Sequence, residues 1–340
     1  MPARESGTRE RPASRSARPY TPDLMKRLLL FIFVLAATRP VAAESREVAL
    51  DRSFGTLRGT LLVPQQGAEI AALIIAGSGP TDRNCNSMLG PGTDAFLYLA
   101  QALEEAGIAS LRYDKRGVGA SRYDDPSRLA DIRFDDFVAD AAACAEFLGR
   151  EGFRKIVLIG HSEGALIALC VAQDNPQIAA VVSLCGPGLP MDRLIERQLA
   201  AQLTFTDLPL LLEARSVLGS LRAGRTTDRY PEQLEMLFAP PLQRYLLTQM
   251  PHDPQRLIAR LTVPVCVVGG DNDLQIPAAD AEALAAACPS AELRIIGGLT
   301  HALKNCAGRT PVEQIPAYTD RTLPLDPELA ACVTRFVGAL

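Results

Sequence analysis

Residues able to perform nucleophilic catalysis occur in this chain in the order serine, aspartate, histidine. Ser162 lies in the pentapeptide G-H-S-E-G (160–164), after the apolar run 156–159 and before a run of small and apolar residues at helical density. A strand, a sharp turn and a helix around G-x-S-x-G are typical of a nucleophile elbow, which exposes the serine hydroxyl. We expect glycine at 160 and 164 because a Cβ there would collide with the neighbouring strand or helix. The alternative interpretation is a Gly-rich turn with an incidental serine.

A serine hydroxyl is a poor nucleophile near neutral pH, so it needs a general base. The chain has three histidines. His161 lies inside the pentapeptide, and we expect its side chain to point away from the Ser162 hydroxyl. His252 lies in a polar stretch and is expected to be solvated. His301 follows the predicted strand 293–296 in a Gly-rich loop that can reach Ser162, which makes His301 the expected base.

The base in turn needs an acid that fixes its tautomer. This acid should lie between the serine and the histidine in chain order. Asp271 and Asp273 both follow the apolar segment 263–270, and either could serve. Asp273 fits the spacing better, whereas Asp271 is better suited to bracing the turn through its backbone.

A developing oxyanion needs backbone N–H donors that are already in place before the reaction. We expect one donor to be the amide of Glu163, directly after the nucleophile, and the other to be Ser78 in the loop G-S-G-P (77–80). A phosphate-binding loop is disfavoured because the G-K-[ST] signature is missing. The string D-K-R-G-V-G-A-S (114–121) is interpreted as structural, its charged residues holding the loop beneath the site by hydrogen bonds.

The elements that must position these residues alternate between strands and helices. An antiparallel hairpin is predicted over 47–64, followed by strands and helices whose rhythm indicates a mostly parallel sheet with functional loops at its carboxyl edge. Predicted strands cover 71–76, 109–113, 156–159, 179–185, 263–269 and 292–296, and predicted helices cover 93–107, 134–149 and 278–287, with a last helix from 326. Residues 191–261 show only amphipathic helical stretches, too long for a connection, which predicts a helical cap. The predicted domains are a core over 44–188 and 262–340, and a cap over 189–261.

Together these strings resemble the α/β-hydrolase superfamily over about residues 48–340, and within it the bacterial esterases of the serine aminopeptidase-like (lysophospholipase-like) group. The carriers of the resemblance are A-G-S-G-P (76–80), D-K-R-G-V-G-A-S (114–121), G-H-S-E-G (160–164), G-G-D-N-D-L-Q-I-P (269–277) and G-L-T-H (298–301). The resemblance implies an eight-stranded, mostly parallel sheet flanked by helices, with the cap inserted after the sixth strand. It also implies a serine esterase mechanism with Ser162, Asp273 and His301 as the triad, and no metal or organic cofactor. Cys85 stands where those relatives usually have glycine.

The first 43 residues form a separate segment. Residues 1–24 are rich in Arg, Ser and Pro and are expected to be disordered. Basic residues 26–27, the apolar core 28–37 and the small residues 41–43 are typical of a secretory signal peptide, with Met25 as the expected start. Ten apolar residues are too few to span a bilayer. The chain is therefore expected to be periplasmic or secreted, without stable membrane insertion after cleavage; an uncleaved anchor is the alternative.

Charge and cysteine content limit the possible partners. Residues 1–43 hold eight Arg or Lys and three Asp or Glu, so the remainder would carry 27 basic and 36 acidic residues. An acidic body is repelled by a phosphate backbone, and nucleic-acid binding is not expected. The eight cysteines form no C-x-x-C pair, which argues against a metal site. Export would permit disulfides, and a Cys85–Cys306 bridge is one hypothesis.

The expected function is an exported serine hydrolase that acts on a small-molecule ester or acyl substrate. A serine peptidase (aminopeptidase-like) or an acyl thioesterase with the same triad is the alternative, and a non-catalytic binding protein is a remote one. An exopeptidase should place an acidic residue near the substrate amine, and the cap offers Glu196, Glu213, Glu232 and Glu235. Apolar cap residues suggest an apolar acyl site but are equally explained by packing: Leu208, Leu210, Leu211, Leu212, Leu234, Leu237 and Phe238.

Overall fold

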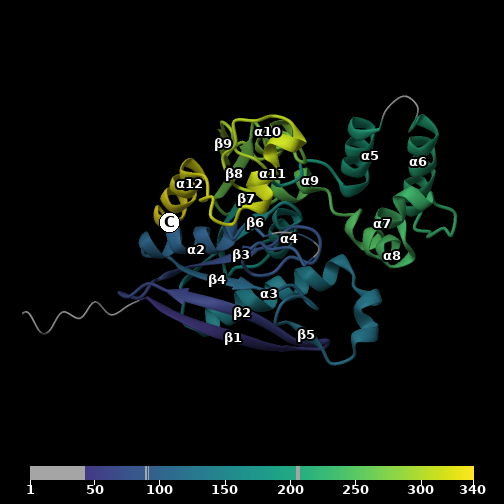
Figure 1. Cartoon of the computed structure of the whole chain (residues 1–340). Helices are drawn as coiled ribbons and strands as arrows, with labels where there is room; N and C mark the ends of the chain where they lie inside the picture. Colours follow the sequence, from purple (N-terminus) through teal and green to yellow (C-terminus); the bar gives the residue numbers. More distant parts are fainter. Residues whose placement is uncertain (1–42, 89, 91, 204–206) are drawn as a thin grey trace, which may run out of the picture. The chain divides into compact units, whose positions relative to one another are not determined.

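The computed structural model describes residues 43–340 apart from 89, 91 and 204–206 (Figure 1). The predicted N-terminal extension and all but the last residue of the predicted signal peptide lie outside the described residues. Within the described part of the chain, no helix is long and apolar enough to cross a membrane.

One mixed sheet forms the centre of the molecule, with its strands in the order β1-β2-β4-β3-β6-β7-β8-β9 (Figure 1). Strands β1 and β2 form the predicted antiparallel hairpin, β2 pairs antiparallel with β4, and all later neighbours are parallel. The bounds are β1 Glu44–Arg52, β2 Gly55–Val63, β3 Ile70–Ile75, β4 Ala109–Tyr113, β6 Lys155–His161, β7 Ile178–Leu184, β8 Val265–Gly270 and β9 Glu292–Ile296. The expected eight-stranded, mostly parallel sheet is confirmed, with the two-residue strand β5 (Arg122–Tyr123) added beside β2.

Helices cover both faces of this sheet, which explains why its central strands are apolar along their whole length rather than alternating. Because successive strand side chains point to opposite faces, Leu73 and Ile75 belong to one core cluster and Ala72 and Ile74 to the other. The first cluster packs against α3 (Phe134–Arg150), α4 (Glu163–Val171) and α10 (Ala278–Ala287), and the second against α2 (Ala95–Glu105) and α12 (Pro327–Gly338). A short 3-10 helix, η1 (Pro126–Asp131), and helix α11 (Pro311–Thr319) lie in connecting segments.

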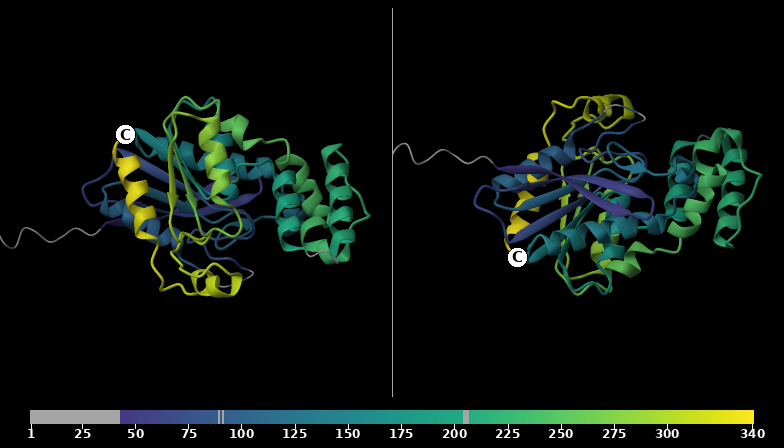
Figure 2. Two further views of the ribbon diagram at one scale, coloured as in Figure 1. Left: turned by 90° about the horizontal axis from the view of Figure 1, so that it is seen from above. Right: turned by 90° about the horizontal axis from the view of Figure 1, so that it is seen from below.

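A group of helices separates β7 from β8, at the place where the sequence predicts a cap. Its elements are α5 Met191–Gln202, α6 Leu208–Arg222, η3 Glu232–Leu234, α7 Glu235–Phe238, α8 Pro240–Gln249 and α9 Pro254–Ile258. Helices α5 to α8, teal to green in Figure 2, gather at one side of the sheet and share a small core of their own around Leu218 and Phe238. Helix α9 belongs by its packing to the body, because Ile258 is fully buried in the cluster beneath α4 and α10.

Candidate active site

Ser162 occupies a sharp turn between β6 and α4. Its backbone angles are φ 55° and ψ −123°, a region that residues with a side chain rarely adopt. A Cβ on Gly160 would lie 2.2 Å from the carbonyl oxygen of Gly164, and a Cβ on Gly164 would lie 2.2 Å from that of Ile75. The expected reason for both glycines is confirmed, since the strand and the helix approach too closely for any larger residue.

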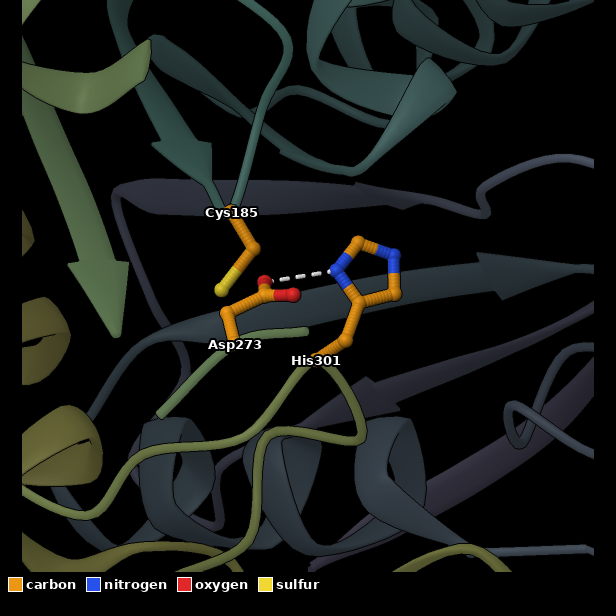
Figure 3. A group of neighbouring side chains, drawn as sticks. All are labelled: Cys185, Asp273 and His301. Carbon is orange, nitrogen blue, oxygen red and sulfur yellow. Dashed lines mark hydrogen bonds and ion pairs between the residues drawn. The ribbon is translucent and has the colours of Figure 1, made fainter. Parts of the chain in front are cut away.

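The structure brings the three candidate catalytic side chains together from the ends of three strands. His301 Nε2 lies 3.0 Å from Ser162 Oγ, within hydrogen-bond distance. His301 Nδ1 lies 2.7 Å from Asp273 Oδ2, and both side chains are buried (Figure 3). The arrangement can remove a proton from the Ser162 hydroxyl and hold the resulting imidazolium against a carboxylate.

Asp273 and Asp271 hold different parts of the site. The other oxygen of Asp273, Oδ1, accepts hydrogen bonds from the amides of Gln275 at 2.8 Å and Ile276 at 2.9 Å. Burial alone would raise the pKa of Asp273. His301 and these two amides lower it by more than burial raises it, so the pKa of Asp273 lies below its usual value. Asp271 instead accepts from the amide of Gly298 at 2.7 Å, in the loop that carries His301. Asp273 thus contacts the base directly, and Asp271 braces the loop.

The other two histidines have structural contacts. His161 Nε2 donates to the backbone carbonyl of His301 at 2.9 Å, so this ring supports the loop that carries His301. Burial, followed by the nearby His301, lowers the pKa of His161 to about 3, which keeps this ring neutral. His252 is solvated only in part: its side chain is 29% exposed, its ring centroid lies 5.0 Å from that of Phe134, and its Nδ1 lies 3.5 Å from Cys170 Sγ. Tertiary packing against α3 and α4 covers a residue whose sequence neighbours are polar.

Both expected oxyanion donors lie beside the nucleophile. Ser78, Ser162, Glu163 and His301 line one cavity. The loop before Ser78 approaches so closely that a Cβ on Gly77 would lie 2.9 Å from Ser162 Cβ. Glu163 is the first residue of α4, where an N–H group has no acceptor within the helix and is available to an anion.

The Glu163 side chain has partners that sequence reasoning did not find. Its carboxylate is buried and accepts from Lys115 Nζ at 3.2 Å, Gln249 Nε2 at 2.9 Å and Ser78 Oγ at 3.3 Å. Lys115 lies in the string 114–121. That string predicted a structural loop but did not predict that Lys115 pairs with Glu163. Gln249 is the last residue of α8, and no pattern in the sequence distinguishes it from other cap glutamines.

The remaining charges of the string 114–121 hold the loop in place, as expected. Asp114 accepts from the backbone amide of Arg83 at 2.8 Å and pairs with its guanidinium at 2.9 Å. It also accepts from the amide of Ala120 at 2.8 Å. Arg116 pairs with the fully buried Asp140 of α3 at 2.8 Å. These contacts fasten the loop after β4 to the loop after β3 and to α3.

Comparisons with known proteins show the family and the fold of this chain. The model of the family described as "Serine aminopeptidase, S33" matches residues 92–305, well over half of the chain. The chain belongs to this family. Among solved structures, the S33-family chain described here is similar to the Pyrococcus furiosus esterase Pf2001 (16% identity, 96% of this chain and 98% of that one, TM-score 0.54). It is also similar to Est1E from Butyrivibrio proteoclasticus with bound ferulic acid (19% identity, 86% and 96%, TM-score 0.54). These likenesses show the α/β-hydrolase fold.

One curated relative of the S33-family chain is "Esterase EstD" from Thermotoga maritima. The two are 26% identical over 280 residues, which cover 81% of this chain and 64% of the relative. The chain therefore spans just under two thirds of the length of that relative.

The cavity at Ser162 has a volume of about 510 Å³ and is mostly apolar or neutral in its lining. Helix α5 contributes Met191, Leu194 and Gln198, so the cap does face the nucleophile. The Leu-rich cap stretches singled out in the sequence do not line it: Leu212 is 54% exposed, and Phe238 is buried in the cap core. These apolar side chains thus pack within the cap or face solvent, and they do not line this cavity.

The hypothesis of a Cys85–Cys306 bridge is wrong in this structure, where both residues are free thiols. Cys306 Sγ lies 3.6 Å from the carbonyl oxygen of Glu313, and Cys85 is packed against the α2 side of the sheet. Cys85 also has φ 72°, a left-handed backbone conformation that favours glycine. Closeness to catalytic elements in the sequence was a poor guide to which sulfurs meet.

One group among the described residues has the donor spacing of a metal site, namely Cys185, Asp273 and His301 (Figure 3). Their donor atoms lie within 4.8 Å of one another. The chemistry does not fit a resident metal, because His301 and Asp273 already bind each other. Burial also raises the pKa of the Cys185 thiol well above its usual value, so the sulfur stays protonated and is a weak ligand.

Proposed function

We propose that this protein is a serine hydrolase that cleaves carboxylic esters, with Ser162, His301 and Asp273 as its catalytic triad. The observation that carries the proposal is the pair of hydrogen bonds joining the three side chains, 3.0 Å and 2.7 Å long, at a strained nucleophile elbow. The name of the curated relative, "Esterase EstD", supports the reaction type.

The geometry supports an acyl-enzyme mechanism. His301 Nε2 takes the proton of Ser162 Oγ while the oxygen attacks the ester carbonyl, and Asp273 stabilises the imidazolium. The amides of Ser78 and Glu163 donate to the tetrahedral oxyanion. When the intermediate collapses, His301 gives its proton to the leaving alkoxide, which departs as the alcohol. His301 then takes a proton from water, which attacks the acyl carbonyl. When this second intermediate collapses, His301 returns the proton to Ser162 Oγ and the acid leaves.

The charges around the cavity favour a neutral ester over a peptide with a free amine. Glu163 is the one acidic side chain among the described lining residues, and it is already paired with Lys115. The cap candidate Glu196 is engaged by Arg215 at 2.8 Å and Arg222 at 3.2 Å. An ammonium group would thus find no free carboxylate among these residues. An acyl thioesterase with the same triad remains the second candidate, since a thioester is equally neutral at its reacting group.

We also propose that the protein is exported through the signal peptide at 25–43. The support is the sequence pattern alone: basic residues, a ten-residue apolar core and small residues before Glu44. N-terminal sequencing of the protein recovered from the periplasm or medium of the expressing cell should start at or next to Glu44. Recovery of the uncleaved chain from the membrane fraction would contradict export as a free protein.

The test of the proposed activity is the hydrolysis of a p-nitrophenyl ester series from acetate to palmitate, compared between the wild type and Ser162→Ala. We expect turnover by the wild type and its loss in the variant, with the chain-length profile giving the size of the acyl site. Cleavage of aminoacyl-nitroanilides without ester cleavage would favour the peptidase. Inactivity towards esters, thioesters and anilides in a folded protein would overturn the enzymatic assignment.

A further inference from the structure

A buried lysine lies directly behind the two expected oxyanion donors. The side chain of Lys115 is 4% exposed and does not line the cavity. Its Nζ donates to the carbonyl oxygen of Gly77 at 2.9 Å and to Glu163 Oε1 at 3.2 Å. The ammonium also lies 4.0 Å from the centroid of the Phe137 ring. Burying an ammonium costs free energy unless its partners compensate for the lost water. The identity of these partners therefore indicates the role of Lys115.

Both polar partners of Lys115 belong to the oxyanion donors. The carbonyl of Gly77 and the N–H of Ser78 are the two ends of one peptide unit. The described chain has no cis peptide bond, and in a planar trans peptide the N–H points opposite to the C=O. Holding the Gly77 carbonyl on Lys115 therefore directs the Ser78 N–H away from the lysine. The second partner, Glu163, carries the other donor on its own backbone.

We propose that Lys115 is a positioning residue of the oxyanion hole; the inference rests on the proposed serine hydrolase function. It acts through the Gly77–Ser78 peptide and through Glu163, and does not touch the substrate. The charge of its ammonium is neutralised by the Glu163 carboxylate, so its contribution is orientation of the donors. Gln249 of α8 holds the other oxygen of Glu163 at 2.9 Å, which ties the cap to the same carboxylate.

The adjacent residue offers a matched control. Arg116 is 7% exposed, pairs with Asp140 at 2.8 Å and lies 4.4 Å from the centroid of the Phe54 ring. It therefore has the same kind of environment as Lys115, a buried ion pair with a cation over an aromatic ring. Its partners belong to α3 and to the β1–β2 turn, and they do not line the cavity.

The experiment compares Lys115→Met with Arg116→Met on a p-nitrophenyl ester that the wild type hydrolyses. Both variants lose thermal stability, because Lys115→Met leaves the buried Glu163 carboxylate without its cation and Arg116→Met leaves the buried Asp140 with Arg52 alone, at 3.2 Å. We expect only Lys115→Met to lower kcat, by about 10²-fold with KM within about twofold, because a misaligned oxyanion donor costs transition-state binding. A trifluoromethyl ketone, which forms a tetrahedral adduct, should bind Lys115→Met more weakly by a similar factor. Arg116→Met should keep kcat within about threefold.

The results separate this inference from the proposed function. An inert wild type would remove the proposed function itself. An active wild type with an unchanged kcat in Lys115→Met, or an equal loss of kcat in both variants, would overturn the positioning role alone. If Lys115→Met does not fold, Lys115→Gln replaces it, since the shorter and neutral amide removes the ammonium from the Gly77 carbonyl and from Glu163 while keeping a polar side chain at this position. A fall in kcat at constant KM is then expected, and an unchanged kcat would contradict the inference.

Discussion

The hydrolase body and the cap make different contributions to the candidate site. In the body, the reacting groups lie at the carboxyl ends of buried parallel strands, and backbone geometry fixes them: Ser162 by a turn at φ 55°, His301 and Asp273 by loops that follow β9 and β8. The cap packs around a small core of its own and reaches the cavity through one face of α5. The proposed chemistry is thus built into the body, whereas the cap contributes part of the lining of the cavity in which we propose that the substrate binds. Changes in the body should affect kcat and folding, and changes in the cap should affect selectivity.

The largest effect is expected for Ser162→Gly in the body. Loss of the nucleophile should lower kcat on the order of 10⁵-fold, as for other serine hydrolases that lose a triad member. Glycine accepts φ 55° without strain, so the same variant should gain about 1 kcal/mol in the free energy of unfolding. Ester kinetics check the expected fall in kcat, and urea denaturation checks the expected gain in the free energy of unfolding. A variant that is inactive but also destabilised would contradict the strained elbow.

The next effect distinguishes the two aspartates after β8. Asp273→Asn should lower kcat about 10⁴-fold, because an amide favours the wrong tautomer of His301. Asp271→Asn is the control. Because the Asp271 carboxylate is held by the Gly298 amide and the Arg309 guanidinium rather than by His301, we expect less than about a tenfold loss of kcat. Equal losses in steady-state kinetics of the two variants would contradict the assignment of the acid.

The lowered pKa of Asp273 also predicts a dependence of stability on pH. A carboxyl whose pKa is lower in the folded state stabilises the fold above its unfolded pKa of about 3.9. That contribution is lost as the pH falls through the lower folded value. The free energy of unfolding of Asp273→Asn should therefore fall less steeply below about pH 4 than that of the wild type. Parallel acid-denaturation curves would show that the carboxylate contributes nothing to the fold.

The packing of the body and the packing of the cap can be compared by replacing one glycine in each. Gly164→Ala places a Cβ 2.2 Å from the carbonyl oxygen of Ile75 and should destabilise the protein by about 3 kcal/mol. Gly219→Ala, inside α6 of the cap, meets nothing within 4 Å and should stabilise by about 0.5–1 kcal/mol. Calorimetric melting of both variants checks the contrast. A destabilised Gly219→Ala would mean that the cap is packed as tightly there as the elbow.

The smallest effect is expected in the cap lining. Leu194→Ala enlarges the cavity and should shift the ratio of kcat/KM between long and short acyl chains towards long chains by about tenfold, leaving the kcat for acetate nearly unchanged. Leu212→Ala is the matched control, because Leu212 lies on the cap but is exposed and does not line the cavity. An equal shift in both variants would place the acyl site elsewhere.

The sequence predicted those features that depend on local pattern. The apolar strands, the glycines of the elbow and the late Gly-rich loop were enough to bring Ser162, Asp273 and His301 to one edge of the sheet. Contacts set by long-range packing were out of reach: the Lys115–Gly77 bond joins two loops, and Gln249 reaches Glu163 from another helix. For the same reason the Cys85–Cys306 hypothesis failed, and the sequence left open whether the cap leucines pack or line the cavity, to which α5 contributes instead.

The central claim is that Ser162 carries the acyl group during turnover. The direct test is rapid acid quenching of the wild type during hydrolysis of a p-nitrophenyl ester, followed by peptide mass spectrometry. The account predicts a mass increase equal to the acyl group on the peptide that contains Ser162, appearing together with a burst of nitrophenol. Steady turnover with an unmodified Ser162 peptide, or with the acyl group on another residue, would contradict it.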